Sequence, residues 1–140
     1  MSLASPTVSS SPLAPSSVVR ESICDALRTV VLEDGTTLSV SASAPQTPEA
    51  FAAWPKWAVS NYTGARLGIV ASHEYDVIVL LPSPDQMTTT ELGDQVLALV
   101  VGALWSLGVI TVAQPAQVLF DTGQSIPALQ IRVIPHPTSN

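Results

Sequence analysis

The chain has 140 residues, of which 11% are charged and 46% are hydrophobic, and its net charge at pH 7 is -6. The length predicts one domain that is large enough to bury its own core. Five lysines and arginines are too few for phosphate contacts, so DNA or RNA recognition is not expected. Ordinary soluble domains carry roughly 25% charged residues. This shortage of charged residues indicates either a surface that is covered by other subunits or a surface made polar by Ser, Thr and Gln.

Residues 1–16 are rich in serine and proline and contain no charged residue. They cannot bury enough apolar area to fold alone, so we expect a flexible N-terminal arm. They also lack the basic residues and the apolar run of a secretory signal, and export by that route is not expected. The folded domain is predicted over residues 17–135, with a C-terminal tail at residues 136–140.

The first half of the folded domain predicts one helix and two strands. Residues 17–32 follow a helical apolar pattern in which Cys24, the single cysteine, is expected to be buried and cannot form an internal disulfide. Residues 36–43 alternate apolar and polar positions, which predicts a strand half exposed to water. Residues 51–62 are strand-like, but Pro55 cannot donate a ladder hydrogen bond. It indicates an edge, a bulge or an extended loop.

The run from residue 95 to residue 120 has no charged residue, which raises the question of a membrane span or a buried core helix. A capping box from Thr88 to Glu91 predicts a helix start near Thr89, and Gly108 predicts its end. Such a helix has a shorter apolar stretch than the ~20 residues that a bilayer requires, and no basic residue anchors it. We therefore expect a core helix lying on a sheet. The preceding residues 75–81 predict a strand with both faces covered.

The last part of the chain predicts a β-hairpin. Residues 109–113 and 116–120 are extended, with Pro115 at a bend or an edge between them. Residues 121–124 form a turn in which Gly123 supplies the positive φ, and residues 128–134 alternate as a final strand. The order α-β-β-β-α-β-β predicts the α+β class, with a mainly antiparallel sheet and two helices packed on it.

The residues offer little chemistry. His73 and His136 have no metal-ligand spacing to each other or to Cys24, so no metal site is expected. Glu74 and Asp76 would share one strand face and could suit acid–base work, but we expect solvated residues at the start of the strand. Neither a phosphate loop nor a nucleophile elbow is present. We predict no catalytic residue, no cofactor and no enzymatic activity.

One local cluster, Trp54-Pro55-Lys56-Trp57, has the composition of a contact surface. Two indoles beside a proline supply large, rigid apolar area of the kind found at interface hot spots. Alternation across Pro55 would not hold both indoles on one face, so two outcomes stay open: at least one indole is exposed in the isolated subunit, or neither is. We interpret these four residues as a candidate interface with another subunit or partner.

The strand at residues 75–81 leading into the long helix, and the closing hairpin at residues 116–134, resemble the tail terminator proteins of long-tailed bacteriophages. The resemblance covers residues 17–135 in pattern and length. It implies a small α+β virion subunit, without catalytic residues, that forms a hexameric ring at the junction of tail and neck. Such a ring caps the tail tube, ends its polymerisation and joins the tail to the head. The implied partners are other copies, the tail tube protein and neck proteins, with assembly in the host cytoplasm. The Ser/Pro arm would equally suit another head-to-tail connector.

A ring would explain the shortage of charge, because each subunit buries two different patches around the axis. We also expect acidic turn residues to line a lumen through which DNA passes without binding, since like charges repel. The candidates are Glu33, Asp34, Asp85 and Asp121. Three alternatives stay open: a small enzyme or ligand-binding domain with a cleft between the second helix and the sheet, a membrane-associated adaptor, and another assembly scaffold.

Overall fold

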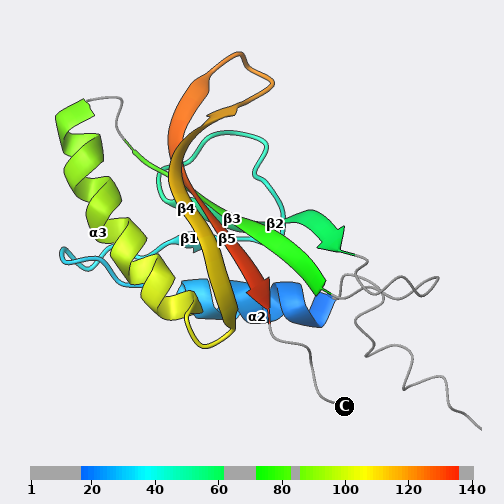
Figure 1. Cartoon of the computed structure of the whole chain (residues 1–140). Coiled ribbons are helices and arrows are strands. Elements are labelled where there is room, and N and C mark those ends of the chain that lie inside the picture. The colour runs from blue at the N-terminus through cyan, green and yellow to red at the C-terminus, as the bar shows by residue number, and fades with distance from the viewer. Residues whose placement is uncertain (1–16, 62–71, 83–85, 136–140) are drawn as a thin grey trace, which may run out of the picture.

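The structure is a computed structural model, and it describes residues 17–61, 72–82 and 86–135 (Figure 1). The elements follow the predicted order, with a very short first strand. They are α2 (Ser17–Arg28), β1 (Ser39–Val40), β2 (Ala52–Asn61), β3 (Ser72–Leu80), α3 (Gln86–Leu104), β4 (Gly108–Leu119) and β5 (Ser125–Pro135). The expected N-terminal arm and C-terminal tail lie outside the described residues.

The strands form one sheet in the order β1-β2-β3-β5-β4. The short β1 pairs with β2 in parallel, and the three other pairings, β2 with β3, β3 with β5 and β4 with β5, are antiparallel. Both described helices pack against this sheet (Figure 1). The predicted α+β class and mainly antiparallel sheet are therefore confirmed.

The main core lies between the two helices and one face of the sheet. α2 contributes Ile23 and Leu27, and α3 contributes Val96, Val100 and Leu104, all fully buried. The α3 positions recur every four residues, so they form one stripe of the helix. Burying each of these side chains stabilises the fold by about 1.5–3 kcal/mol. The helix predicted to lie on the sheet is therefore the one that completes this core.

The central strand β3 has both of its faces covered, as predicted. Val77 and Val79 face the helices and are fully buried, whereas Ile78 and Leu80 on the opposite face are exposed by only 8% and 0%. Neighbouring strands β2 and β5 flank β3 on both sides. A strand in this position has a continuously apolar sequence, because its side chains are buried on both faces of the sheet.

The predicted helix ends were wrong in three places. α2 ends at Arg28 rather than at residue 32, because Val30 and Leu32 are buried while Val31 between them is 52% exposed. That alternation of period two requires extended chain. α3 runs Gln86–Leu104, so Thr89 does not begin it and Gly108 does not end it. Helix ends depend on packing as well as on local caps.

Gly108 is instead the first residue of β4, where the backbones of β4 and β5 approach closely. A Cβ atom added there would overlap the Ile134 carbonyl oxygen and lie 2.6 Å from the Pro135 Cα. The predicted hairpin turn is confirmed, since Gly123 has φ +88° and its N–H donates to the Phe120 carbonyl oxygen at 2.8 Å. Glycine therefore serves close approach at one end of β4 and turn geometry at the other.

Both strand prolines occupy edge positions, as expected. β1 pairs only with residues 52–53 of β2, so Pro55 lies beyond its end and has a described neighbour only in β3. Pro115 lies in β4, the outer strand next to β5. The strand predicted at residues 36–43 is shorter than expected, with only Ser39–Val40 in the sheet. Among the described residues, no helix is long and apolar enough to cross a membrane.

Candidate functional site

The sheet face opposite the helices, here called the second face, carries a small core of its own. Alternation along β3 turns Ile78 and Leu80 toward it, and Trp54 of β2 lies directly opposite Ile78. Trp54 is only 5% exposed. Phe120 and Ala128 from the β4–β5 hairpin complete this cluster. The hairpin extends beyond the other strands in Figure 1, and its residues near the turn, including Phe120, pack on the second face.

A ladder of polar side chains crosses the same face. The Arg132 guanidinium donates from Nε to Asp76 Oδ1 at 2.8 Å and from Nη2 to Asp76 Oδ2 at 3.1 Å. Gln130 Nε2 donates to Asp76 Oδ2 at 2.9 Å, and Gln114 Nε2 donates to Gln130 Oε1 at 3.3 Å. Arg132 Nη1 also lies 3.6 Å from Glu74 Oε1. These five residues, here called the polar ladder, connect β3, β5 and β4.

Burial makes the ladder an internal ion-pair network. The side chains of Asp76 and Glu74 are 9% and 15% exposed, and that of Arg132 is 32% exposed. The hydrogen bonds to Asp76 raise the pKa of Arg132 above its usual range. The expectation that Glu74 and Asp76 are solvated was therefore wrong, although they do share a strand face. Register decides this, because β5 places Arg132 directly opposite Asp76.

A cavity of about 720 Å³ opens beside the ladder on the second face. Residues 54–56 of β2, Ile78 and the ladder residues Asp76 and Gln130 line it on the sheet, and the other lining residues come from three further segments. These are Arg20 of α2, residues 42–44 of the loop after β1, and residues 116–119 of β4. This cavity is not the cleft between α3 and the sheet that a ligand-binding reading of the sequence required.

Two cationic groups of the cavity have no ion pair among the described residues. The structure describes four basic side chains: Arg28 pairs with Glu21 and Asp25, Arg132 pairs with Asp76 and Glu74, and Arg20 and Lys56 have no ion pair there. Both unpaired cations line the cavity. Lys56 lies opposite Asp76 in the strand register, but both Asp76 oxygens already accept from Arg132 and Gln130. Among the residues that line the cavity, the two cations thus exceed the single carboxylate, that of Asp76, by one formal charge.

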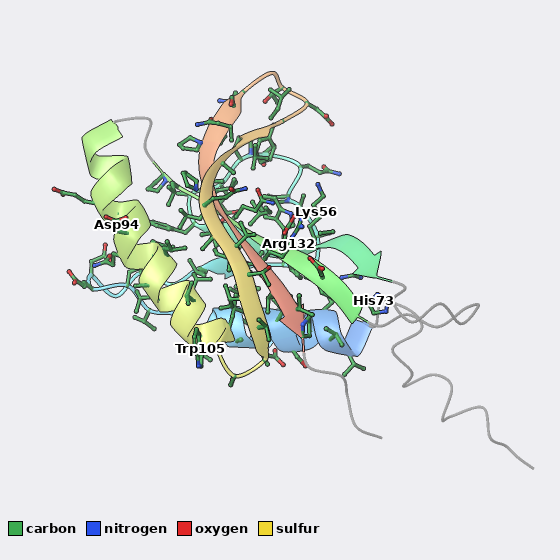
Figure 2. All side chains as sticks on the ribbon, viewed as in Figure 1. Lys56, His73, Asp94, Trp105 and Arg132 are labelled. Carbon is green, nitrogen blue, oxygen red and sulfur yellow. The ribbon has the colours of Figure 1, made fainter. Side chains whose placement is uncertain are left out.

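The predicted contact cluster at residues 54–57 divides between core and surface. Trp54 and Pro55 are buried within the chain, so neither offers exposed apolar area to a partner. Lys56 is exposed and lies over the central strands beside Arg132 (Figure 2). Trp57 belongs to β2, and its side chain lies outside the described part of the structure. Of the three described side chains of this cluster, that of Lys56 is the exposed one.

The acidic turn residues occupy separate parts of the surface. Glu33 and Asp34 are exposed in the turn between α2 and β1, and Asp121 is exposed at the tip of the β4–β5 hairpin. Figure 1 shows these two turns at different ends of the molecule. Hydrogen bonds from Thr36 to Asp34 lower the pKa of that carboxyl group. Asp85 lies outside the described residues.

The outside of α3 is acidic toward its beginning and apolar toward its end. Within residues 91–104 the exposed positions are two carboxylates, Glu91 and Asp94, followed by Ala98, Leu99 and Gly102. Trp105, directly after the helix, is 70% exposed and points away from the sheet (Figure 2). We call these six residues the outer face of α3. Helix spacing of three and four residues aligns most of them along one side.

The edge strand β4 is exposed along its length and has no charged residue in its 12 positions. Val109, Val112 and Leu119 on it are 55%, 37% and 74% exposed. Natural sheets blunt such edges with charged side chains, bulges or covering segments, because an open edge can pair with another chain. Here Pro115 and the register shift near residues 110–112 interrupt the edge, but no lysine protects it.

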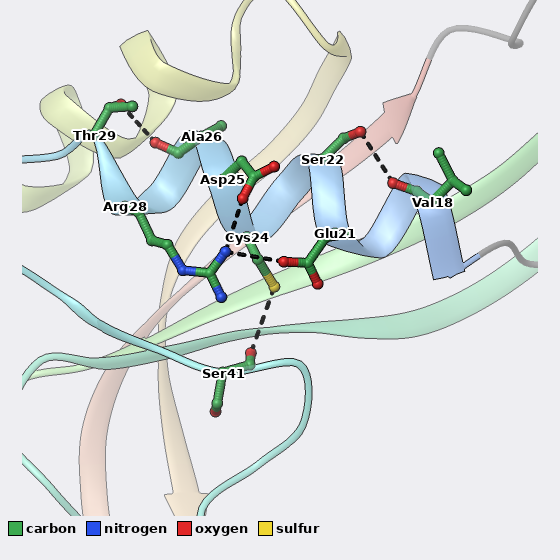
Figure 3. Close-up of polar contacts among 9 residues, drawn as sticks. All are labelled: Val18, Glu21, Ser22, Cys24, Asp25, Ala26, Arg28, Thr29 and Ser41. Carbon is green, nitrogen blue, oxygen red and sulfur yellow. Dashed lines mark hydrogen bonds and ion pairs between the residues drawn. The ribbon is translucent and has the colours of Figure 1, made fainter.

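Groups with chemical reactivity are few in the described residues. Cys24 is fully buried, its Sγ lies 3.7 Å from the Ser41 carbonyl oxygen, and burial raises the pKa of its thiol (Figure 3). It is thus the buried small side chain that the sequence predicted. No group of three or more His, Cys, Asp or Glu side chains is arranged for a metal ion within residues 17–61, 72–82 and 86–135. His136 lies outside these residues.

No protein-family model matches the chain, and no curated protein matches it in sequence. The features that sequence reasoning missed are the polar ladder, the cavity with its two cations, and the exposed outer face of α3. Alternation of Gln130 and Arg132 in the last strand was a usable signal for the ladder. The other two features depend on which face of each element meets the core.

Proposed function

We propose that this protein is a structural subunit that assembles with copies of itself into a closed ring. The observation that carries the proposal is the exposed surface formed by β4, which has no charged residue, and by the apolar part of the outer face of α3, Leu99 and Trp105. Monomeric proteins rarely leave contiguous apolar surface uncovered, and an unprotected edge strand invites pairing. The low overall charge, 11% of residues, points the same way.

A ring is the form of assembly that suits this distribution. The apolar positions of α3 and the cavity on the second face are different surfaces of one subunit. Contacts between unlike patches are head-to-tail, and they close into a ring when the rotation between subunits is a whole fraction of a turn. A two-fold dimer would instead require each patch to pair with itself.

The location that we propose for this ring is the tail of a long-tailed bacteriophage. The basis is the resemblance of residues 17–135 to tail terminator proteins. In that role a hexameric ring caps the tail tube, ends its polymerisation and joins the tail to neck proteins at the head. Glu33, Asp34, Asp85 and Asp121 would then repel DNA that passes through the lumen. Another head-to-tail connector is the alternative within the same class.

The mass of the purified chain in solution tests the ring. Light scattering and negative-stain images of the same peak should give a ring of about six copies, either free or on added tail tubes. A monomer that stays monomeric at high concentration and ignores tail tubes would overturn the proposal. A ring that forms but does not bind tail tubes would support the ring assembly and contradict its proposed location at the end of the tail tube.

The lumen assignment has its own test in assembled particles. Replacing Glu33 and Asp121 with lysine would place positive charge where DNA passes, and genome delivery should slow. Delivery at the unaltered rate by such particles would remove the lumen assignment and leave the ring untouched.

A further inference from the structure

The cavity on the second face and the outer face of α3 are complementary in charge. The cavity presents two cations without ion-pair partners in the described structure, Arg20 and Lys56. The exposed N-terminal half of α3 presents two carboxylates, Glu91 and Asp94, which also have no ion pair there. Glu91 and Asp94 are three residues apart, so they project from one side of the helix.

The apolar surfaces adjoining these charges also correspond. Beyond its carboxylates, the outer face of α3 continues into Leu99, 36% exposed, and Trp105, 70% exposed. The cavity wall continues into Leu119, whose side chain is 74% exposed. Each surface thus has a charged part and an apolar part, with opposite charge on the two. Such an arrangement fixes the direction of docking as well as its strength.

The two surfaces cannot satisfy each other within one chain. Asp94 lies on the side of α3 that points away from the sheet, whereas Lys56 lies over the central strands (Figure 2). α3 packs its opposite side, with Val96 and Val100, into the main core, so its outer face is fixed in an outward direction. Pairing therefore requires a second copy.

We propose that the outer face of α3 of one subunit docks on the cationic cavity of the next, with Glu91 and Asp94 against Lys56 and Arg20. This inference rests on the proposed ring and specifies its repeating contact. Leu99 and Trp105 of the docking helix then cover the apolar rim at Leu119. The contact is head-to-tail, so each subunit uses its helix toward one neighbour and its cavity toward the other.

Charge reversal on each surface tests the contact. The double variant R20E/K56E reverses the cavity, and E91K/D94K reverses the helix. Each variant alone has like charges at every contact, and its self-association should weaken at least about 100-fold. A one-to-one mixture of the two variants restores opposite charges at every contact of an alternating ring. The mixture should therefore recover the wild-type mass, as should the fourfold variant that carries both reversals.

A control with the same change in net charge is available on another surface. The variant E33K/D121K adds as much positive charge as E91K/D94K, but at the two turns rather than on α3. It should assemble like the wild type. Recovery in the mixture also shows that the reversed variants are folded, because an unfolded subunit would not be rescued by its partner.

The outcomes separate this contact from the ring itself. Wild-type chains that remain monomeric with and without tail tubes overturn the ring and this contact together. Rings that persist in both reversed variants overturn the contact alone, and so does a mixture that fails to recover although both variants are monomeric. Loss of assembly in each variant with recovery in the mixture supports the contact, provided that E33K/D121K still forms rings.

Discussion

Replacing Arg132 with glutamine should destabilise the fold through the carboxylate that it leaves behind. Asp76 accepts two hydrogen bonds from Arg132 and one from Gln130, and its side chain is 9% exposed. Removing one partner of a buried ion pair costs about 3–5 kcal/mol. Because the Arg132 side chain is 32% exposed, water reaches the site and screens part of this loss. We expect a loss of about 2–3 kcal/mol in the free energy of unfolding.

The cognate change Asp76→Asn should cost less, about 1–2 kcal/mol, because no uncompensated charge remains buried and the amide still offers an acceptor. Denaturant unfolding of the wild type, both single variants and the double variant closes a double-mutant cycle. The coupling energy should be about 1–2 kcal/mol. Arg28→Gln is the matched control, since Arg28 bridges Glu21 and Asp25 on the open surface of α2 (Figure 3).

The exposed α2 pair should contribute no measurable stability, because water and salt screen it. Additive effects of Arg132→Gln and Asp76→Asn, or a loss for Arg132→Gln no larger than for Arg28→Gln, would refute the reasoning. Either result would mean that Asp76 is hydrated in solution and that the polar ladder does not act as a buried network.

Three further predictions concern single residues. Gly108→Ala should destabilise the protein by about several kcal/mol, because its Cβ would overlap the backbone of β5. Gly102→Ala, on the open side of α3, should stabilise it by about 0.5–1 kcal/mol. Thermal unfolding of the two variants measures both effects. The raised pKa of Cys24 means that only the unfolded chain ionises just above the usual pKa of 9.0. The contribution of the thiol to stability should be fully present below pH 9.0 and be lost as the pH rises through the folded pKa. The variant Cys24→Ala should lack this pH dependence. Trp54→Ala should lower the free energy of unfolding by about 3–5 kcal/mol, because Trp54 is buried. Trp105→Ser should leave the unfolding midpoint unchanged and weaken self-association, because Trp105 is exposed.

The sequence determined the class of fold because the burial that its local patterns predict agrees with the burial in the structure. The apolar run in β3, the alternation in β5 and the turn at Gly123 each have a local physical cause, and all three are present in the structure. The same holds for the edge prolines Pro55 and Pro115, since a residue without an N–H disfavours pairing on both sides; among the described residues each is paired on one side only, with Val77 and with Leu129. Element ends were less predictable, because α2 stops where Val30 and Leu32 must both reach the core.

The candidate site was decided by tertiary structure. Composition placed Trp54 in a candidate interface, but the hairpin residues near the turn pack on the second face and bury it. Asp76 and Arg132 are separated by 56 residues, and only the register between β3 and β5 brings them together. The helix α3 was correctly expected on the sheet. Its sequence could not say which apolar side chains would remain outside, since that follows from the rotation at which Val96, Val100 and Leu104 meet the core.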